Sequence, residues 1–189
     1  MDMKIGFIGL GIMGRPMALN LRKAGYPLWV HARHAETMAP LVAAGATACS
    51  SPAEVASKVD LLFTLVADTA DVEQVILGDQ GVLAGARPGL ILVDMSTISP
   101  AATRALAKRL GEGGLSMLDA PVSGGEMGAI QGTLSIMVGG KEAIFAVVRP
   151  LFEILGKNIV YIGDHGAGQV CKSCNQIAIS QTLAGVGEA

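Results

Sequence analysis

The chain has 189 residues, of which 51% are hydrophobic and 16% are charged, and its formal net charge is −2. This length suits one domain, or one domain and the start of a second, and the composition supports a large core. The charge balance, without any run of Lys or Arg, argues against nucleic acid and an anionic membrane surface as partners. No apolar stretch reaches transmembrane length and the N-terminus lacks a signal-peptide pattern, so we expect a cytoplasmic protein.

Strands and helices are predicted to alternate along the chain. Short apolar runs predict strands at residues 4–8, 26–32, 46–49, 60–66, 90–94, 115–119, 134–138 and 158–162. Helices are predicted at residues 15–24, 36–44, from 51 onwards, at 69–77, 99–110, 142–155 and from 168 onwards, and a turn is predicted at 78–81. Because strand and helix alternate, we expect an α/β fold with a doubly wound, mostly parallel sheet.

The glycine-rich stretch from Gly9 to Gly14 lies between the first predicted strand and the first predicted helix. Gly9, Gly11 and Gly14 have the spacing G-x-G-x-x-G. In such a loop the first glycine makes the tight turn, the second lets a pyrophosphate approach the backbone, and the third lets the helix pack on the strand. The N–H groups at the helix start then face the phosphates. This context predicts dinucleotide binding, and a turn that only packs the helix on the strand is the structural alternative.

The end of the second predicted strand bears on the choice of dinucleotide. A site that prefers NAD(H) usually has Asp or Glu here to bind the ribose 2′-hydroxyl, but this chain has Ala32 followed by Arg33. The planar guanidinium of Arg33 suits a 2′-phosphate. The sequence therefore favours NADP(H) over NAD(H), and an exposed arginine without a ligand is the alternative.

Two later stretches follow predicted strands and carry polar groups. Ser123, Gly124 and Gly125 offer a hydroxyl and free N–H groups at a helix start, a small anion pocket that would fit a substrate carboxylate. A glycine-rich turn capped by Ser123 is the alternative. On the last predicted helix, Lys172 shares a face with Asn175 and Gln176, as expected for a positioned proton donor, although lone surface lysines are common.

The three cysteines do not form a disulfide framework, because their number is odd and low. Cys171-x-x-Cys174 has the spacing of a redox or metal site, but zinc would need two further ligands. We expect two small residues on a packed helix, and no metal.

These motifs together resemble the β-hydroxyacid dehydrogenase family, at residues 6–14 with Pro16-Met17, 93–97, 119–125 and 166–176. Within the family, residues 123–126, 132–140 and 172–176 are most similar to the tartronate semialdehyde reductases. The 3-hydroxyisobutyrate dehydrogenases more often have a second Asn in place of Gln176. The resemblance implies NAD(P)H-dependent, reversible reduction of tartronate semialdehyde (2-hydroxy-3-oxopropanoate) to D-glycerate. The alternatives are a 3-hydroxyisobutyrate dehydrogenase, a succinic semialdehyde reductase, a non-catalytic nucleotide-binding fragment, and a CxxC redox protein.

The resemblance also implies a role for each matching residue. The pyrophosphate would be held by Gly9, Gly11, Ile12, Met13 and Gly14, and the adenosine ribose phosphate by Arg33. Val66 and Ala67 would flank the cofactor, and Ser96 and Thr97 would lie near the nicotinamide. Ser123, Gly124 and Gly125 would bind the substrate carboxylate, Lys172 would be the catalytic acid/base, and Asn175 and Gln176 would orient the substrate.

The family's domain organisation leads to a further expectation. By resemblance, residues 1–165 form a Rossmann-like cofactor domain, and residues 166–189 begin a long interdomain helix. That helix would lead into an all-helical second domain that this sequence does not include. A full-length protein of this kind would be a homo-oligomer, a dimer or tetramer, and the fragment alone would be poorly active.

Overall fold

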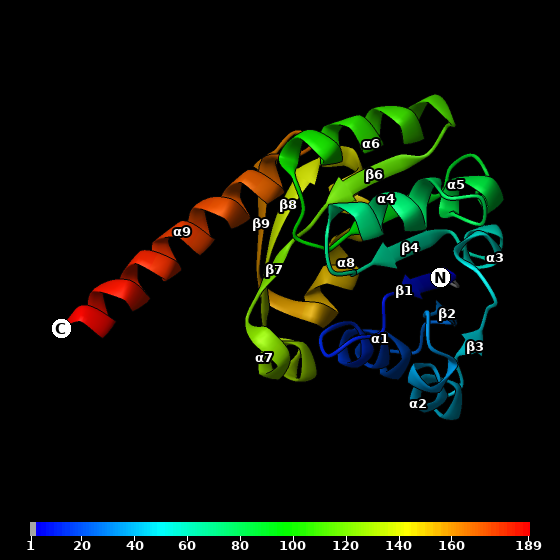
Figure 1. Ribbon diagram of the computed structural model, residues 1–189. Helices are drawn as coiled ribbons and strands as arrows, with labels where there is room; N and C mark the ends of the chain where they lie inside the picture. Colours follow the sequence, from blue (N-terminus) through cyan, green and yellow to red (C-terminus); the bar gives the residue numbers. More distant parts are fainter. Residues whose placement is uncertain (1–2) are drawn as a thin grey trace.

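The computed structural model describes residues 3–189, in which a nine-stranded sheet is covered by helices on both faces (Figure 1). The strands are β1 (Ile5–Ile8), β2 (Leu28–His31), β3 (Thr47–Ala48), β4 (Leu61–Thr64), β5 (Ile91–Asp94), β6 (Ser116–Asp119), β7 (Val122–Ser123), β8 (Leu134–Gly140) and β9 (Gly156–Gly163). The helices are α1 (Gly14–Lys23), the 3-10 turn η1 (Ala35–Thr37), α2 (Ala39–Ala43), α3 (Pro52–Lys58), α4 (Thr69–Leu77), α5 (Val82–Gly85), α6 (Pro100–Glu112), α7 (Gly125–Gln131), α8 (Glu142–Leu155) and α9 (Ala167–Glu188).

The strand order confirms the predicted Rossmann-like fold. The first six strands are parallel in the order β3-β2-β1-β4-β5-β6, so the order reverses between β1 and β4. The last residues of β1, β4, β5 and β6 lie side by side, because Ile8 pairs with Thr64, Thr64 with Asp94, and Asp94 with Asp119. In such sheets, ligands bind at this carboxyl edge, where the order reverses.

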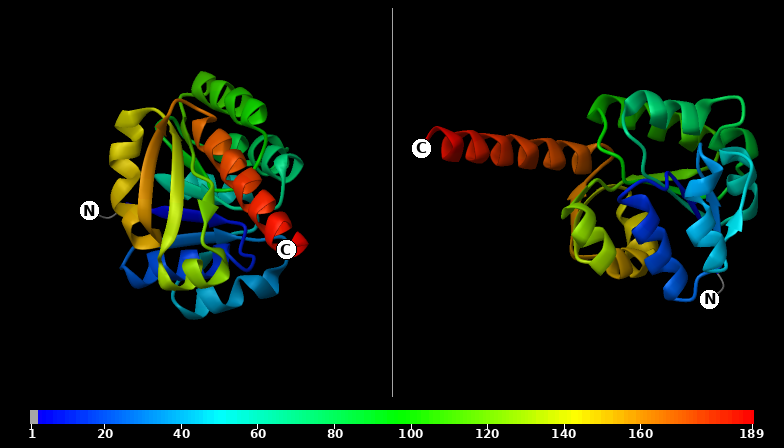
Figure 2. Two further views of the ribbon diagram at one scale, coloured as in Figure 1. Left: turned by 90° about the vertical axis from the view of Figure 1, so that its left-hand side faces the viewer. Right: turned by 60° about the horizontal axis from the view of Figure 1, so that its bottom comes forward.

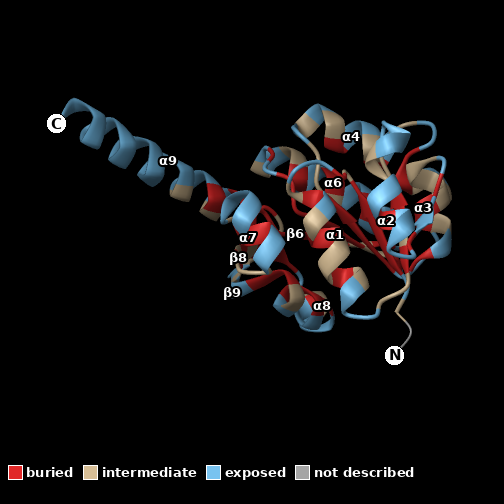
Figure 3. Ribbon diagram, turned by 90° about the horizontal axis from the view of Figure 1, so that it is seen from below, coloured by how far each residue is buried: buried red, intermediate tan, exposed pale blue. Residues whose placement is uncertain are grey.

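Each central strand supplies core residues to both faces of the sheet. On one face, Phe7 and Phe63 stack with ring centroids 5.8 Å apart and are covered by α1, α2 and α8. On the other face, Leu62 and Leu92 pack against α3, α4 and α6. Figure 3 shows that buried residues follow the strands and the inner sides of the helices. Burial on both faces explains why the strands are continuous apolar runs.

The sheet is mostly parallel, as predicted, and β8 is antiparallel to β6 and β7. The structure differs from the sequence-based expectation in two places. The helix predicted at residues 36–44 is divided into η1 and α2, where Pro40 occupies the first turn of α2. The short elements β7 and α5 were not predicted. Val122 and Ser123 form a strand only through their pairing with β8, a contact that no local pattern encodes.

Helix α9 begins inside the protein and then extends away from it (Figures 1 and 2). Its buried residues are Gly168, Gln169 and Lys172, whereas every residue from 176 onwards is exposed (Figure 3). The sheet and the helices that cover it therefore contact and position only the first turns of α9. Within residues 3–189, no helix combines the length and apolar character needed to cross a membrane.

Candidate functional site

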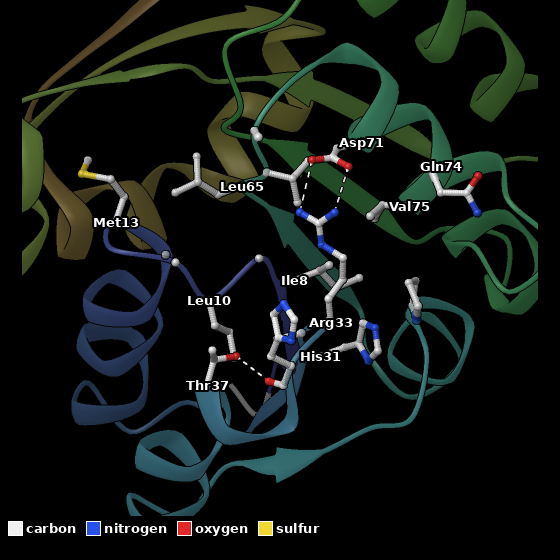
Figure 4. Close-up of a pocket in the computed structure, with 18 of the residues that line it drawn as sticks. Ile8, Leu10, Met13, His31, Arg33, Thr37, Leu65, Asp71, Gln74 and Val75 are labelled. Atoms are coloured by element: carbon white, nitrogen blue, oxygen red, sulfur yellow. Dashed lines mark hydrogen bonds and ion pairs between the residues drawn. The ribbon is translucent and has the colours of Figure 1, made fainter.

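A pocket with a volume of about 780 Å³ lies over the carboxyl ends of β1, β2 and β4, where the strand order reverses (Figure 4). Its lining consists of residues 8–14, 31–34 and 65–67, together with Thr37, Pro52, Asp71, Gln74, Val75, Gln80 and Gly81. This volume is in the range of small-molecule and cofactor sites. The reversal point is where dinucleotides bind in doubly wound sheets.

The three glycines of the loop after β1 have different surroundings. Gly9 has a positive φ of +95°, and a Cβ atom there would collide with the backbone oxygen of Leu65. A Cβ atom on Gly14 would collide with the backbone oxygen of Gly9. A Cβ atom on Gly11 would meet nothing within 4 Å. Gly9 and Gly14 are therefore required by packing, whereas Gly11 leaves space in front of the backbone for a ligand.

The same loop presents hydrogen-bond donors that have no partner in residues 3–189. No acceptor lies within hydrogen-bonding geometry of the backbone N–H groups of Ile12, Met13 and Gly14. The first turn of α1 contains no acidic residue, and no side chain caps it. Free N–H groups and the helix dipole together favour an anion at this position. The open space at Gly11 and these unpaired donors fit the pyrophosphate of a dinucleotide.

Arg33 follows β2, lines the pocket and forms an ion pair with Asp71 (Figure 4). The two terminal nitrogens of the Arg33 guanidinium each lie 3.4 Å from one oxygen of the Asp71 carboxylate. Sequence reasoning selected Arg33 but missed Asp71. The signal that could have revealed Asp71 is its position in the first turn of the helix that follows β4, because that turn lies at the same sheet edge.

Four residues in the loops after β4 and β5 were predicted to lie beside the cofactor, and two of them line the pocket. Val66 and Ala67 are part of the lining. Ser96 is fully buried, and its hydroxyl accepts a hydrogen bond from the backbone N–H of Val66 at 2.9 Å. Thr97 is exposed and lies outside the lining. The structure thus places Ser96 beneath the loop that forms the pocket wall.

Two buried carboxylates end β5 and β6. Asp94 accepts hydrogen bonds from the Thr64 hydroxyl at 2.8 Å and the Ser96 N–H at 3.2 Å, and burial raises the pKa of Asp94 to about 6. Asp119 accepts hydrogen bonds from the N–H groups of Gly166 at 2.8 Å and Gln169 at 3.1 Å, and burial raises its pKa above the usual value. Asp94 thus holds the loop that follows β5, and Asp119 holds the start of α9.

Lys172 is the one buried cation among residues 3–189, with an exposed fraction of 8%. No carboxylate within that range forms an ion pair with it, and burial lowers the pKa of Lys172 below its usual value. Asn175 is half-buried, and its side-chain amide lies 3.4 Å from that of the exposed Gln176. An unpaired, desolvated ammonium group is a suitable proton donor because its pKa lies closer to neutral pH.

Ser123, Gly124 and Gly125 span the junction of β7 and α7, because Ser123 ends β7 and Gly125 begins α7. Gly124 and Gly125 have positive φ values of +136° and +62°, and Gly124, not Ser123, occupies the N-cap position of α7 without a side-chain cap. The alternative interpretation of this stretch was a glycine-rich turn capped by the Ser123 side chain, and that cap is not formed. Strand β7 and helix α9 both contact β8. Neither residues 123–125 nor Lys172, Asn175 and Gln176 line the 780 Å³ pocket.

Cys49, Cys171 and Cys174 are all free thiols. Within the described part of the chain, no three His, Cys, Asp or Glu side chains are grouped so as to hold a metal ion.

Comparison with known proteins agrees with this architecture. Residues 4–163 match the family model for the NAD binding domain of 6-phosphogluconate dehydrogenase. Among the most similar relatives, 2-hydroxy-3-oxopropionate reductase from Escherichia coli (strain K12) is 49% identical over 191 residues, which cover 99% of this chain and 64% of that protein. 2-(Hydroxymethyl)glutarate dehydrogenase from Eubacterium barkeri is 43% identical over 188 residues, which cover 100% of this chain and 62% of that protein.

A crystal structure of 3-hydroxyisobutyrate dehydrogenase from Salmonella typhimurium superposes with a TM-score of 0.91 at 36% identity, covering 99% of this chain and 66% of that one. The chain thus spans about two thirds or less of the length of these relatives. The glycine loop, the strand order and the family match together show that the chain belongs to the family of NAD(P)-binding, Rossmann-like domains of the β-hydroxyacid dehydrogenases.

Proposed function

We propose that this chain is the cofactor-binding part of an NAD(P)H-dependent oxidoreductase that reduces tartronate semialdehyde to D-glycerate. The observation that carries the proposal is the pocket over β1, β2 and β4, with its unpaired N–H groups at Ile12, Met13 and Gly14. The likeness to 2-hydroxy-3-oxopropionate reductase supports the choice of substrate.

In this proposal, the glycine loop holds the pyrophosphate, and Arg33 binds a phosphate on the adenosine ribose, which favours NADP(H) over NAD(H). Val66 and Ala67 line the wall beside the cofactor, and Ser96 supports that wall through its hydrogen bond to Val66. The bound dinucleotide supplies a hydride for the aldehyde carbon.

The protein groups act on the substrate oxygens. Lys172 donates a proton from Nζ to the carbonyl oxygen as negative charge develops there, and its lowered pKa makes this transfer easier at neutral pH. The hydroxyl of Ser123 and the N–H groups of Gly124 and Gly125 bind the substrate carboxylate, while Asn175 and Gln176 orient the substrate. In the reverse oxidation, neutral Lys172 accepts the proton, so that direction should accelerate as pH rises.

The proposal also concerns a full-length protein of which this chain would be one part. Residues 1–165 would form the cofactor domain and residues 166–189 the start of a helix leading to a second, helical domain that closes the site. The full-length protein would then be a homo-oligomer. Helix α9, which leaves the body after its first turns, is suited to such a connection.

The test has two steps. The affinities of the 189-residue chain for NADPH and NADH are measured by calorimetry, and reduction of tartronate semialdehyde is then followed in the full-length protein. We expect NADPH to bind, and Lys172→Ala to lower kcat by about 10²- to 10⁴-fold, while the exposed control Lys157→Ala keeps full activity. Retained reduction in the Lys172→Ala variant would exclude the acid/base role. Faster turnover of 3-hydroxyisobutyrate in the same panel would replace the substrate assignment, and absence of binding to either nucleotide would refute the proposal.

A further inference from the structure

The ion pair between Arg33 and Asp71 joins two separate parts of the pocket wall. Arg33 follows β2 and Asp71 lies in the first turn of α4, 38 residues later in the chain. Both side chains line the pocket, and Figure 4 shows the guanidinium extended towards the carboxylate. The pair therefore lies at the end of the pocket where a phosphate on the adenosine ribose is expected.

The contact occupies the nitrogens that a phosphate would use. Both terminal nitrogens of Arg33 point to Asp71, one to each carboxylate oxygen, at 3.4 Å. A phosphate bound in the planar, two-pronged manner that suits arginine needs at least one of the same nitrogens. Binding of a phosphate and the Asp71 contact thus compete for one guanidinium.

The pair is weak enough to be exchanged. The Arg33 side chain is 77% exposed and that of Asp71 is 29% exposed, so water screens their attraction. Asp71 also does not cap α4. The capping residue is Asp68, whose carboxylate accepts a hydrogen bond from the backbone N–H of Asp71 at 2.9 Å. The Asp71 carboxylate would remain close to a phosphate on Arg33 and would repel it.

We propose that Asp71 is a specificity-determining residue that lowers the affinity of the pocket for a dinucleotide with a phosphate on its adenosine ribose, relative to one without it. It does so by occupying Arg33 and by opposing the phosphate charge. Arg33 favours NADP(H), and Asp71 limits that preference. The inference rests on the proposed nucleotide binding and assigns the balance between the two cofactors to a residue pair.

The experiment measures the dissociation constants of NADPH and NADH for the wild-type chain, for Asp71→Asn and Asp71→Ser, and for the control Glu73→Gln, an exposed residue of the same helix outside the pocket lining. The loss of one exposed ion pair corresponds to a change of about threefold to fivefold in the dissociation constant of NADPH. We expect both Asp71 variants to bind NADPH more tightly by that factor, with NADH binding changed by less than about twofold and both constants unchanged in Glu73→Gln. The gain should shrink at 0.5 M salt because the charges are exposed.

Three results would overturn the inference. An unchanged ratio of NADPH to NADH affinity in both Asp71 variants would show that Asp71 does not compete, while the proposed function would stand. Weaker NADPH binding in these variants would show that Asp71 instead orients Arg33 for the phosphate. If neither nucleotide binds to the wild-type chain, the proposed function fails and the inference fails with it.

Discussion

The side-chain amide of Gln169 donates a hydrogen bond from Nε2 to the backbone oxygen of Ser96, with a distance of 2.8 Å between the two atoms. The amide oxygen of Gln169 accepts a second hydrogen bond from the N–H of Ile98 at 3.1 Å. Gln169 lies three residues before Lys172 on α9, and the hydroxyl of Ser96 supports the pocket wall at Val66. A single buried side chain thus connects the helix that carries Lys172 with the loop beside the pocket over β1, β2 and β4.

Replacement of Gln169 should therefore destabilise the fold strongly. Gln169→Met keeps the approximate shape but leaves the Ser96 oxygen and the Ile98 N–H buried without partners, and each lost partner costs about 1–3 kcal/mol. We expect the free energy of unfolding, measured with urea, to fall by about 2–4 kcal/mol. The matched change Gln181→Met, on the exposed part of α9, should stay within about 0.5 kcal/mol of wild type. If Gln169→Met lowered the free energy of unfolding no more than the control does, the hydrogen bonds of Gln169 to Ser96 and Ile98 would not be formed in solution.

The glycine loop allows packing and ligand access to be tested separately. Gly11→Ala adds a methyl group where nothing lies within 4 Å, so the melting temperature should be almost unchanged, but NADPH affinity should fall by about tenfold or more because the methyl group fills ligand space. Gly9→Ala and Gly14→Ala place the same methyl group against backbone oxygens and should lower the melting temperature clearly. Full NADPH binding by the Gly11→Ala variant would contradict the assignment of this loop to the pyrophosphate.

Asp94 should make stability depend on pH in an identifiable window. Burial raises the pKa of Asp94 from 3.8 to about 6 in the folded protein, so the folded state binds more protons than the unfolded state between those values. The contribution of Asp94 to stability is then fully present below about pH 4 and is lost as pH rises through about 6. The free energy of unfolding of wild type relative to Asp94→Asn should fall by an amount on the order of 2 kcal/mol between pH 4 and pH 7.

The exposed control for this series is Asp79→Asn, whose stability should follow that of wild type at each pH. Parallel pH profiles of wild type and Asp94→Asn would show that Asp94 does not titrate in this range.

The buried ammonium group of Lys172 should reduce the stability of the fold. The buried ammonium group has no carboxylate partner within residues 3–189, and burial lowers its pKa. Lys172→Met removes this desolvation, so we expect the free energy of unfolding at pH 7 to rise by about 1 kcal/mol, with NADPH binding retained. Lys141→Met, at an exposed position, should have little effect on stability. A lower melting temperature in Lys172→Met would mean that the ammonium group is stabilised by partners in solution.

The sequence by itself determined those parts of the protein whose structure depends on residues close together in the chain. The G-x-G-x-x-G loop, the apolar central strands and the boundaries of α4 and α8 were predicted correctly, because periodicity and the strand–loop–helix context are local signals. The loop at residues 9–14, Arg33, Val66 and Ala67 do line one pocket, since parallel strands bring their carboxyl ends to one edge of the sheet.

Only the tertiary structure decided which distant groups meet. Strand β7 exists through its pairing with β8, Asp71 reaches Arg33 across 38 residues, and Gln169 reaches Ser96 across 73. The burial of Lys172 and the raised pKa of Asp94 likewise follow from elements that pack over them. Such contacts depend on strand order and helix packing, and those are properties of the whole chain that no short stretch of sequence encodes.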